Sequence, residues 1–356
     1  MFLDAHVHLA TGTPGNEYFP PRYRLDRSLI WAYSGGKKWV QGFERDPLDL
    51  YPRMEERVSD PDGTATVAAL DKAGVDAAVL IHADFGPSRG ELQPKSMEEM
   101  HRDYADLQAK HEGKLYGFAG PDVRRPGSLE VVGRAIGEWG LKGLKVMPQV
   151  GYYPSDRMLY PFYQKCLEYD VPVSICTNYE SSYSRAVFND PIHITSLVAD
   201  FPDLNVIIFH SGYPFDHWFE EAVQIAHSAF NVYLEFAGWS IHGGSKRPDL
   251  TEEEWVRKLS HARDMVGAQR MIMGTDGQFA HSDWGTRAAE RYTTTIEAWR
   301  SLRSTASKYG VDFSQEEVDL ITGMNMARLL KLVDMPQYNK RKYGWSILTP
   351  PPRLSP

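Results

Sequence analysis

Short apolar runs alternate with amphipathic stretches along most of the chain, and this alternation predicts the secondary structure. The apolar runs are bounded by glycine, proline or polar residues, which is typical of buried parallel strands. We expect eight strands, at 2–7, 77–81, 116–119, 143–146, 172–176, 205–210, 232–236 and 271–274. Amphipathic stretches predict helices over 64–73, 97–110, 131–139, 159–169, 218–227, 252–265, 287–308 and 316–332.

Eight strands that alternate with helices favour an α/β fold of one particular kind, the closed (β/α)8 or TIM barrel. An open doubly wound sheet would be expected to carry a glycine-rich loop after its first strand, whereas histidines stand there in this chain. We expect one barrel domain over residues 1–335. Because a TIM barrel presents its chemistry at the carboxyl ends of its strands, polar residues at those ends become the candidates for a functional site.

Two segments do not fit the alternating pattern. Residues 11–62 form a long excursion after the first strand, and a loop of this length is typical of a lid or binding element, although packing against the barrel mouth explains it equally well. Residues 336–356 form an extended, proline-rich tail that wraps its own domain or a second subunit. The lid-like insertion offers aromatic and cationic side chains that could enclose a substrate, namely Arg22, Tyr23, Arg24, Trp31 and Trp39.

The composition of the 356 residues narrows the class of protein. A hydrophobic fraction of 42% and a charged fraction of 24% are typical of soluble globular proteins. The net charge of −8 argues against nucleic acid as the main partner. The apolar runs are too short to span a bilayer and no secretory signal pattern stands at the N-terminus, so we expect a cytoplasmic protein without membrane association. Two cysteines, Cys166 and Cys176, suit a reducing compartment.

Candidate metal ligands stand at the ends of three predicted strands. His6 and His8 point to the same side of their strand because side chains alternate with period two, and two imidazoles there can bind one divalent cation. His210 ends the sixth strand and Asp276 follows the eighth. Asp276 could be a metal ligand, a general base, or the N-cap of a helix. Four such residues at three strand ends predict a catalytic site at the rim of the barrel.

The sequence resembles the amidohydrolase superfamily, in particular the amidohydrolase-related branch that includes aminocarboxymuconate-semialdehyde decarboxylase. The matching motifs are DAHVH at 4–8, GLKVMP at 143–148, IFHSG at 208–212, GTD at 274–276 and NMARLL at 325–330. The resemblance implies that His6 and His8 bind a divalent metal, most often zinc, with manganese, iron or cobalt as alternatives. It also implies that Asp276 is a ligand and proton acceptor, and that His210 is a ligand or a hydrogen-bond partner of the water or substrate. A homodimer is expected from the same resemblance.

Two positions leave the number of metal ions open. Cys176 stands where the family has a histidine at the end of the fifth strand, and it is either a thiolate ligand or a small buried thiol. Lys145 matches the lysine that is carboxylated in binuclear members of the superfamily, and its alternative is an ammonium paired with an acid or with substrate. A metal-free member that hydrolyses a lactone shows that catalysis does not require every ligand.

Further polar or aromatic residues follow other predicted strands and could bind substrate. His82 follows the second strand, Arg124 the third, and Glu235 and Trp239 the seventh. Arg124 could bind a substrate carboxylate through two hydrogen bonds, although a salt bridge with another side chain is the more usual arrangement for an arginine.

The leading hypothesis is a metal-dependent hydrolase that acts on a small amide, ester or lactone. The metal would activate a water molecule, and Asp276 would take its proton and return it to the leaving group. The first alternative is a non-oxidative decarboxylase of an aromatic or unsaturated carboxylic acid, which the aromatic lid residues favour and the missing histidine disfavours. A metal-independent lactonase and a non-enzymatic binding protein are the remaining alternatives.

Overall fold

A computed structural model gives the fold of residues 1–33, 47–51, 54–179, 184–240, 247 and 249–333. The predicted lid residue Trp39, the side chain of Trp31 and the tail at 336–356 lie outside the described residues. The strands are β1 Leu3–His8, β2 Ala77–Ile81, β3 Leu115–Phe118, β4 Leu144–Val146, β5 Val173–Cys176, β6 Val206–Phe209, β7 Val232–Glu235, β8 Met271–Ile272 and β9 Gly277–Gln278. In this part of the chain, no helix has the length and apolar character needed to cross a membrane.

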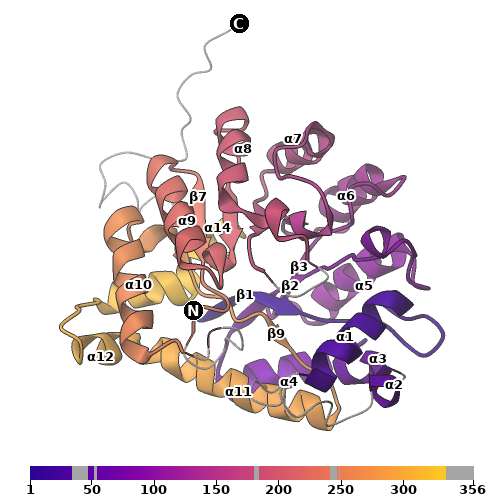
Figure 1. Cartoon of the computed structure of the whole chain (residues 1–356), viewed down its shortest axis with the longest axis horizontal. Coiled ribbons are helices and arrows are strands. Elements are labelled where there is room, and N and C mark those ends of the chain that lie inside the picture. The colour runs from indigo at the N-terminus through magenta and orange to yellow at the C-terminus, as the bar shows by residue number, and fades with distance from the viewer. Residues whose placement is uncertain (34–46, 52–53, 180–183, 241–246, 248, 334–356) are drawn as a thin grey trace, which may run out of the picture.

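Most of the helices surround the strands, and those from α4 to α10 follow one another around them in the order of the chain (Figure 1). They are α1 Pro21–Tyr33, α2 Pro47–Leu50, α3 Met54–Val58, α4 Thr64–Ala73, α5 Met97–Lys110, α6 Ser128–Gly137, α7 Tyr160–Tyr169, α8 Ile194–Asp200, α9 Asp216–Ser228, α10 Glu252–Val266, α11 Asp283–Arg300, α12 Leu302–Ser307, α13 Gln315–Asp319 and α14 Asn325–Leu329. The first three belong to the insertion after β1 and lie together on one side of the strands in Figure 1.

The strands form two parallel sheets that meet at both edges. One sheet has the order β3-β2-β1-β9 and the other the order β4-β5-β6-β7-β8. A parallel bridge between Ala119 and Leu144 joins the first sheet to the second beyond β3. At the other edge, the backbone N–H of Ala5 donates to the carbonyl of Met273, at 3.2 Å, directly after β8. This order matches the predicted (β/α)8 architecture, with the eighth strand divided into β8 and β9.

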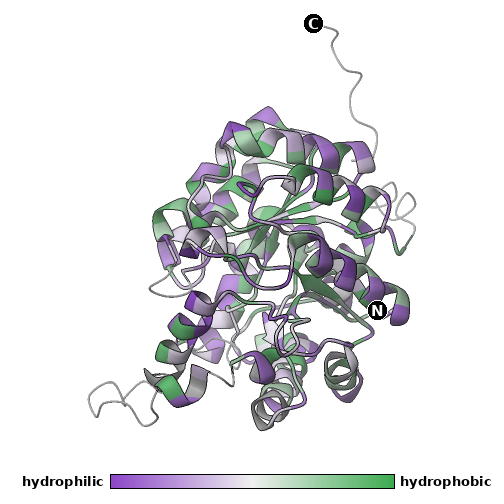
Figure 2. Cartoon of the chain, turned by 90° about the vertical axis from the view of Figure 1, so that its right-hand side faces the viewer, coloured by the Kyte–Doolittle hydropathy of each residue, from purple (hydrophilic) through white to green (hydrophobic). Residues whose placement is uncertain are grey.

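Apolar residues alternate between two clusters along the strands. In β2, Ala77, Val79 and Ile81 belong to a cluster inside the strands, whereas Ala78 and Leu80 belong to the larger cluster between strands and helices. Helix α14 adds Met326 and Leu329 to the inner cluster, among other residues. Figure 2 shows the same arrangement, with hydrophobic residues on the central strands and hydrophilic ones on the outer sides of the helices.

Strand β1 changes the side to which its residues point. Leu3 and Ala5 belong to the inner cluster, but Val7 belongs to the outer one. The pairing register with β2 shifts between Asp4 and Val7, and this irregularity interrupts the simple alternation. His6 and His8 therefore point toward the interior of the barrel mouth, on the same side as each other.

The predicted elements agree with the structure except where they are short or interrupted. The bounds of β2, α4 and α5 are those expected from the sequence. The single helix expected over 287–308 is divided into α11 and α12, and that over 316–332 contains a segment at 320–324 with an extended Gly323. The seven-residue helix α8 was not expected. Asp276 does not cap a helix, because β9 follows it directly, so this alternative was wrong.

Candidate active site

Three predicted metal ligands converge at the mouth of the barrel. The Nε2 atoms of His6 and His8 lie 3.2 Å apart. The Oδ1 atom of Asp276 lies 3.1 Å from Nε2 of His8 and 3.6 Å from Nε2 of His6. The two histidines come from β1, and Asp276 comes from the turn between β8 and β9, so the first and the last strand of the barrel build this group.

The geometry of this group fits a divalent cation. Two ligand atoms bound to zinc at about 2.1 Å with tetrahedral angles lie roughly 3.4 Å apart. The three observed distances, 3.1, 3.2 and 3.6 Å, lie close to that value. His8 donates from Nδ1 to the carbonyl of Ile81 at 2.9 Å, which orients the ring so that Nε2 faces the other two possible ligands. Burial and the neighbouring Lys145 lower the pKa of His6 well below its usual value, so that its imidazole is neutral.

The carboxylate of Asp4 links β1 to the turn that carries Asp276. Its Oδ1 atom accepts hydrogen bonds from the backbone N–H of His6, at 3.0 Å, and of Thr275, at 3.1 Å. Its Oδ2 atom accepts from the hydroxyl of Thr275 at 2.6 Å. The carboxylate is fully buried. Asp4 therefore fixes the position of the irregular part of β1 relative to the residue that precedes Asp276.

The electrostatic surroundings of Asp276 favour its ionised form. Burial acts to raise its pKa, but the hydrogen bond with His8 and the charges of His210 and Lys145 hold the pKa well below its usual range. An ionised carboxylate is the form that binds a metal or accepts a proton.

A second group of possible ligand atoms shares His6 with the first. His6, His210 and Glu235 bring a nitrogen or oxygen atom each within 4.8 Å of one another, and all three are buried. Glu235 accepts from the backbone N–H groups of His210, at 2.7 Å, and Ala237, at 2.8 Å. Burial raises its pKa to about 8. Gly274 makes room for this carboxyl, because a Cβ atom there would lie 1.8 Å from Oε1 of Glu235.

Lys145 and Cys176 line the same cavity from neighbouring strands. The Nζ atom of Lys145 lies 4.1 Å from the centroid of the Phe209 ring, and the residue is 2% exposed. The thiol of Cys176 donates to Oδ1 of Asn178 at 3.0 Å. Among the described residues, Cys176 belongs to none of the groups of three possible ligands. Its predicted role as a metal ligand therefore has less geometric support than those of His6, His8 and Asp276.

A cavity of about 110 Å³ opens beside the metal-binding group. For comparison, a dry cavity of roughly 150 Å³ holds benzene in another protein. Its polar lining includes His8, Asp276, His210, Lys145, Cys176, Asn178, Gln149, Gln278 and Arg27. Its aromatic lining consists of Tyr18, Phe19, Tyr23, Phe85 and Tyr104. The volume is therefore somewhat below that of a known benzene cavity, and it limits a ligand to a small molecule.

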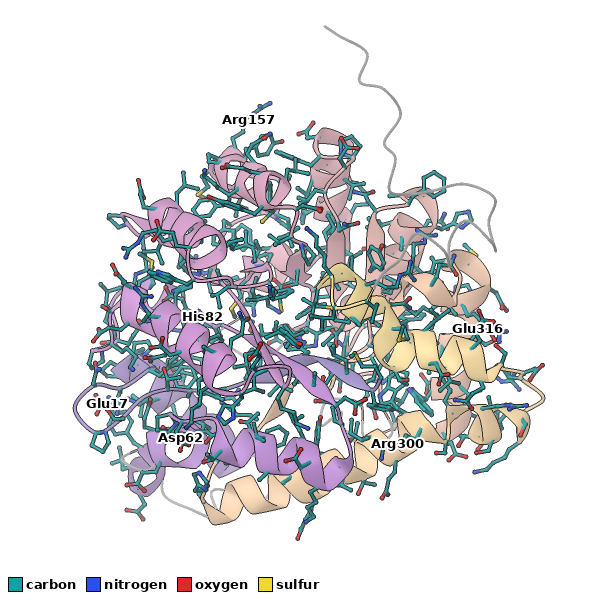
Figure 3. All side chains as sticks on the ribbon, turned by 180° about the vertical axis from the view of Figure 1, so that it is seen from behind. Glu17, Asp62, His82, Arg157, Arg300 and Glu316 are labelled. Atoms are coloured by element: carbon teal, nitrogen blue, oxygen red, sulfur yellow. The ribbon has the colours of Figure 1, made fainter. Side chains whose placement is uncertain are left out.

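None of the four residues predicted to bind substrate, Arg124, His82, Glu235 and Trp239, is among those that line this cavity. Arg124 donates to Asp122 through Nε at 2.8 Å and through Nη2, so its guanidinium is bound to an aspartate of the protein. Trp239 is buried and donates from Nε1 to the carbonyl of Ser211 at 3.2 Å. His82 lies inside the molecule, as Figure 3 shows, and stacks on His101 with ring centroids 4.3 Å apart. Arg124 and Trp239 are thus bonded within the fold, whereas Nε2 of His82 has no hydrogen-bond partner among the described residues. Direct contact of these residues with a substrate stays a prediction.

Several residues of the cavity were not identified from the sequence. Arg27 lies on α1 and Tyr18 just before it, both in the insertion, whereas Gln149 and Asn178 follow β4 and β5. None of them belongs to a motif. The position of Gln149 and Asn178 just after predicted strands was the one signal that could have indicated two of them.

The comparisons with known proteins agree with this fold. The sequence matches the amidohydrolase family over residues 3–332. An uncharacterised TIM-barrel protein from Bordetella bronchiseptica is 16% identical, covers 93% of this chain and 98% of its own, and has a TM-score of 0.59. A dihydroxybenzoic acid decarboxylase from a Polaromonas species, solved with bound manganese and an inhibitor, is 16% identical, covers 94% and 98%, and has a TM-score of 0.56.

Two further proteins are similar to this chain. A 4-oxalomesaconate hydratase from Rhodopseudomonas palustris is 15% identical, covers 97% of this chain and all of its own (100%), and has a TM-score of 0.54. The fungal protein fluG from Emericella nidulans is 26% identical over 108 residues, which is 30% of this chain and 11% of that protein. The similarity to the solved structures establishes the TIM-barrel fold, as predicted from the sequence.

Proposed function

The chain belongs to the amidohydrolase family, and on this premise we propose that it is a metal-dependent decarboxylase of a small aromatic or unsaturated carboxylic acid. The lining of the cavity supports this reaction over the hydrolysis of an amide or ester. The cavity combines flat apolar walls with two cationic side chains, next to a group that fits a divalent metal.

The aromatic walls of the cavity would hold a planar substrate. Phe19 and Tyr23 stack with ring centroids 4.8 Å apart, and Tyr23 stacks on Phe85 at 4.4 Å with an angle of 13° between the rings. Tyr18 packs edge-on against Phe19 at 4.9 Å. Such ring faces bind other rings favourably in offset or edge-on arrangements. Three of these four rings come from the insertion at 11–62, and this supports a lid-like role for that insertion.

The cationic side chains of the cavity would bind the carboxylate of the substrate. Lys145 reaches the cavity from β4 and Arg27 reaches it from α1. A guanidinium group binds a carboxylate through two parallel hydrogen bonds, and a buried ammonium adds a charge close by. In this role Lys145 acts as an ammonium and needs no carboxylation.

Asp276 would deliver the proton that the reaction consumes. The bond between the substrate carbon and its carboxylate carbon breaks and carbon dioxide leaves. The electron pair that remains on the substrate carbon takes a proton that Asp276, ionised at rest, has accepted from a water molecule, which leaves as hydroxide. A carboxyl group with a low pKa is a strong acid once it is protonated, which suits a weakly basic carbon atom. His6, His8 and Asp276 would hold the divalent metal, which supplies Lewis-acid polarisation of the substrate oxygens when bound.

A hydrolase remains the second candidate, and the low pKa of Asp276 favours it. In the ionised state, Asp276 can accept a proton from an attacking water molecule, while His210 lies beside His6, with ring centroids 4.8 Å apart, to orient the substrate. The same residues would therefore serve either reaction, and the difference between the two proposals lies in the substrate.

The decisive experiment measures both reactions on the same preparation. Manganese-loaded protein is incubated with a panel of hydroxybenzoates and unsaturated acids, and carbon dioxide release is measured. In parallel, the protein is offered a panel of lactones, esters and amides. We expect carbon dioxide release that disappears in the Asp276→Asn variant. Hydrolysis without any carbon dioxide release would overturn the proposal in favour of the second candidate.

We propose the identity of the metal, the oligomeric state and the location of the protein from the sequence. The family and the manganese in a related structure support a divalent metal, and zinc is the ion that we expect first at a site of two imidazoles and one carboxylate. A homodimeric assembly and a cytoplasmic location are likewise proposed. Metal analysis and light scattering on the purified protein would test the first two.

A further inference from the structure

Gln149 is a buried polar residue of the cavity that the proposed reaction leaves without a role. It follows β4 in the short helical turn Pro148–Val150 and is 2% exposed. Its side chain lines the cavity together with Lys145, four residues earlier in the chain. Its main chain is held in place, because the carbonyl of Gln149 accepts from the backbone N–H of Arg185 at 3.1 Å. The amide group is therefore presented from a fixed position.

The side-chain oxygen of Gln149 has no hydrogen-bond partner in the protein. Oε1 is buried without a donor within hydrogen-bond distance among the described residues. A buried amide without a partner costs free energy, so native structures normally satisfy such groups with protein, water or ligand. Because this amide lines the cavity, a ligand is in a position to supply the missing donor.

The polar side of the cavity extends to Asn178, after β5. The oxygen of its side chain already accepts from the thiol of Cys176, and its backbone carbonyl accepts from the side chain of Asn189. Asn178 is thus engaged on both of its oxygen atoms, whereas Gln149 is engaged only through its main chain. This contrast singles out the Gln149 side chain as the group that is ready for a new hydrogen bond.

The aromatic and the polar parts of the lining come from different elements. The aromatic residues belong to the insertion, to the segment after β2 and to α5, whereas Gln149 and Asn178 follow β4 and β5. A ring that lies against the aromatic residues, with its carboxylate at Lys145 and Arg27, would have an edge available for Gln149. A substituent on that edge would have to donate a hydrogen bond.

We propose that Gln149 is a specificity-determining residue that accepts a hydrogen bond from a hydroxyl group on the ring of the substrate. The proposal rests on the function proposed above and narrows its substrates to hydroxylated planar acids. A site built to bond a hydroxyl rejects the analogue that lacks it, because the amide is then left unpaired in a buried position.

The test compares the binding of three acids to the manganese-loaded protein by calorimetric titration. The acids are benzoate, 3-hydroxybenzoate and 4-hydroxybenzoate. The 2-hydroxy acid is left out because its hydroxyl and carboxylate would chelate the metal together. We expect the protein to bind at least one of the hydroxy acids roughly tenfold more tightly than benzoate, as a single added hydrogen bond allows.

Two variants separate recognition by Gln149 from general effects on the fold. In Gln149→Met, which keeps the length of the side chain, we expect the preference for the hydroxy acid to fall below roughly twofold while benzoate binding is retained. Gln93→Met is the matched control. Gln93 is also buried, with an Oε1 atom that has no partner among the described residues, but it does not line the cavity. The control should keep the full preference.

The possible results bear differently on the role of Gln149 and on the proposed function. An equal preference in the unaltered protein and in Gln149→Met, or no preference in either while benzoate binds, would overturn the role of Gln149 and leave the proposed decarboxylase standing. If none of the three acids binds to the manganese-loaded protein, the role of Gln149 in recognising a hydroxylated ring fails, and the proposed function is decided by the carbon dioxide assay alone.

Discussion

At the scale of single residues, the backbone of His210 and Asp276 adopts a conformation that L-amino acids seldom take. Their φ angles are 67° and 58°, in the left-handed region. For residues other than glycine, this conformation costs on the order of 1–3 kcal/mol and persists only where the surroundings impose it. Here Glu235 accepts from the N–H of His210, and Asp4 accepts from the N–H of Thr275, directly before Asp276. Buried carboxyl groups thus hold both side chains at the cavity.

The first prediction concerns the charge of Asp276. In Asp276→Asn the side chain keeps its shape but can neither carry a proton nor offer a charged ligand atom. We expect turnover to fall by roughly 10²-fold or more, since general acid or base catalysis contributes about that factor. Circular dichroism should show an unchanged fold. Retention of more than a tenth of the activity would exclude Asp276 from the proton transfer.

The second prediction concerns Cys176, whose thiol bonds to Asn178 and joins no group of possible ligands in the described residues. We expect Cys176→Ser to keep the metal content of the unaltered protein, because a hydroxyl can replace the thiol as a donor to Asn178. Elemental analysis of protein purified without chelator measures this directly. A loss of most of the metal would instead identify the thiolate as a ligand.

At the scale of elements, the junction between β1 and the turn after β8 depends on one buried side chain. Asp4→Asn replaces an oxygen that accepts a hydrogen bond by an NH₂ group that faces donors. We expect unfolding to become easier by about 1–3 kcal/mol. Metal affinity should fall by roughly 10- to 100-fold, because groups that orient ligands have effects of that size. Urea unfolding and metal titration measure the two effects, and an unchanged metal affinity would show that β1 is positioned without Asp4.

The insertion is attached to the barrel mouth through Glu55 on α3. Its Oε1 atom accepts from the N–H of Tyr18 at 2.7 Å, and Gly12 makes room, since a Cβ atom there would lie 1.6 Å from the same oxygen. Burial raises the pKa of Glu55 from 4.5 to about 7, while the N–H of Tyr18 and the charge of Arg24 act in the opposite direction. The carboxyl therefore binds its proton more tightly in the folded protein than in the unfolded chain.

This difference sets a pH dependence that can be measured. A folded-state pKa above the unfolded value means that the contribution of Glu55 to stability is largest below pH 4.5 and declines as the pH rises to about 7. The decline is on the order of 3 kcal/mol. We expect Glu55→Gln to lack this decline, as measured by urea unfolding at several pH values. Glu56→Gln, which alters the exposed neighbour on α3, should keep it, and a decline that survives in Glu55→Gln would assign it to another group.

How far an element could be predicted depended on its local signals. Helix α5 has the predicted bounds because Ser96 and Glu99 form a capping box at its start. Helix α4 ends as expected at Gly74, whose φ of 66° suits glycine. Helix α8 was missed because its seven residues form fewer than two full turns, too few for an amphipathic repeat to emerge. The irregularity in β1 has no sequence signal of its own, and Asp4, which lies within it, is bonded to Thr275, a residue 271 positions away in the chain.

The candidate site, too, could be predicted only in part. His6, His8, His210 and Asp276 could be chosen as candidates because strand ends are predictable from apolar runs and their side chains are ordinary metal ligands. The structure brings these residues together in two groups that share His6. Arg27 and Tyr18 could not be identified, because the path of the insertion across the barrel mouth depends on tertiary contacts such as that of Glu55. Arg124 was a candidate because it follows the third predicted strand, and the sequence left open whether it binds substrate or forms a salt bridge. The structure shows its guanidinium bonded to Asp122, two residues earlier.

At the scale of the whole molecule, the proposed metal site joins the two ends of the barrel. His6 and His8 belong to the first strand, and Asp276 stands between β8 and β9, where the last strand returns to β1. A ligand that binds only the folded state stabilises it by about 2.7 kcal/mol when present at one hundred times its dissociation constant. A metal bound to these residues would therefore oppose the separation of the first and last strands.

We expect a chelator to lower the thermal unfolding temperature by a few degrees and to abolish activity, and added manganese or zinc to restore both. His8→Ala provides the control, because a protein that lacks this ligand should start from the lower unfolding temperature and respond little to the chelator. If activity survives complete removal of the metal, the metal-independent lactonase becomes the better interpretation. If activity is lost without a change in unfolding temperature, the ion serves the reaction but does not hold the first and last strands together. The two readouts thus separate a catalytic from a structural role of the same three ligands, which neither could do alone.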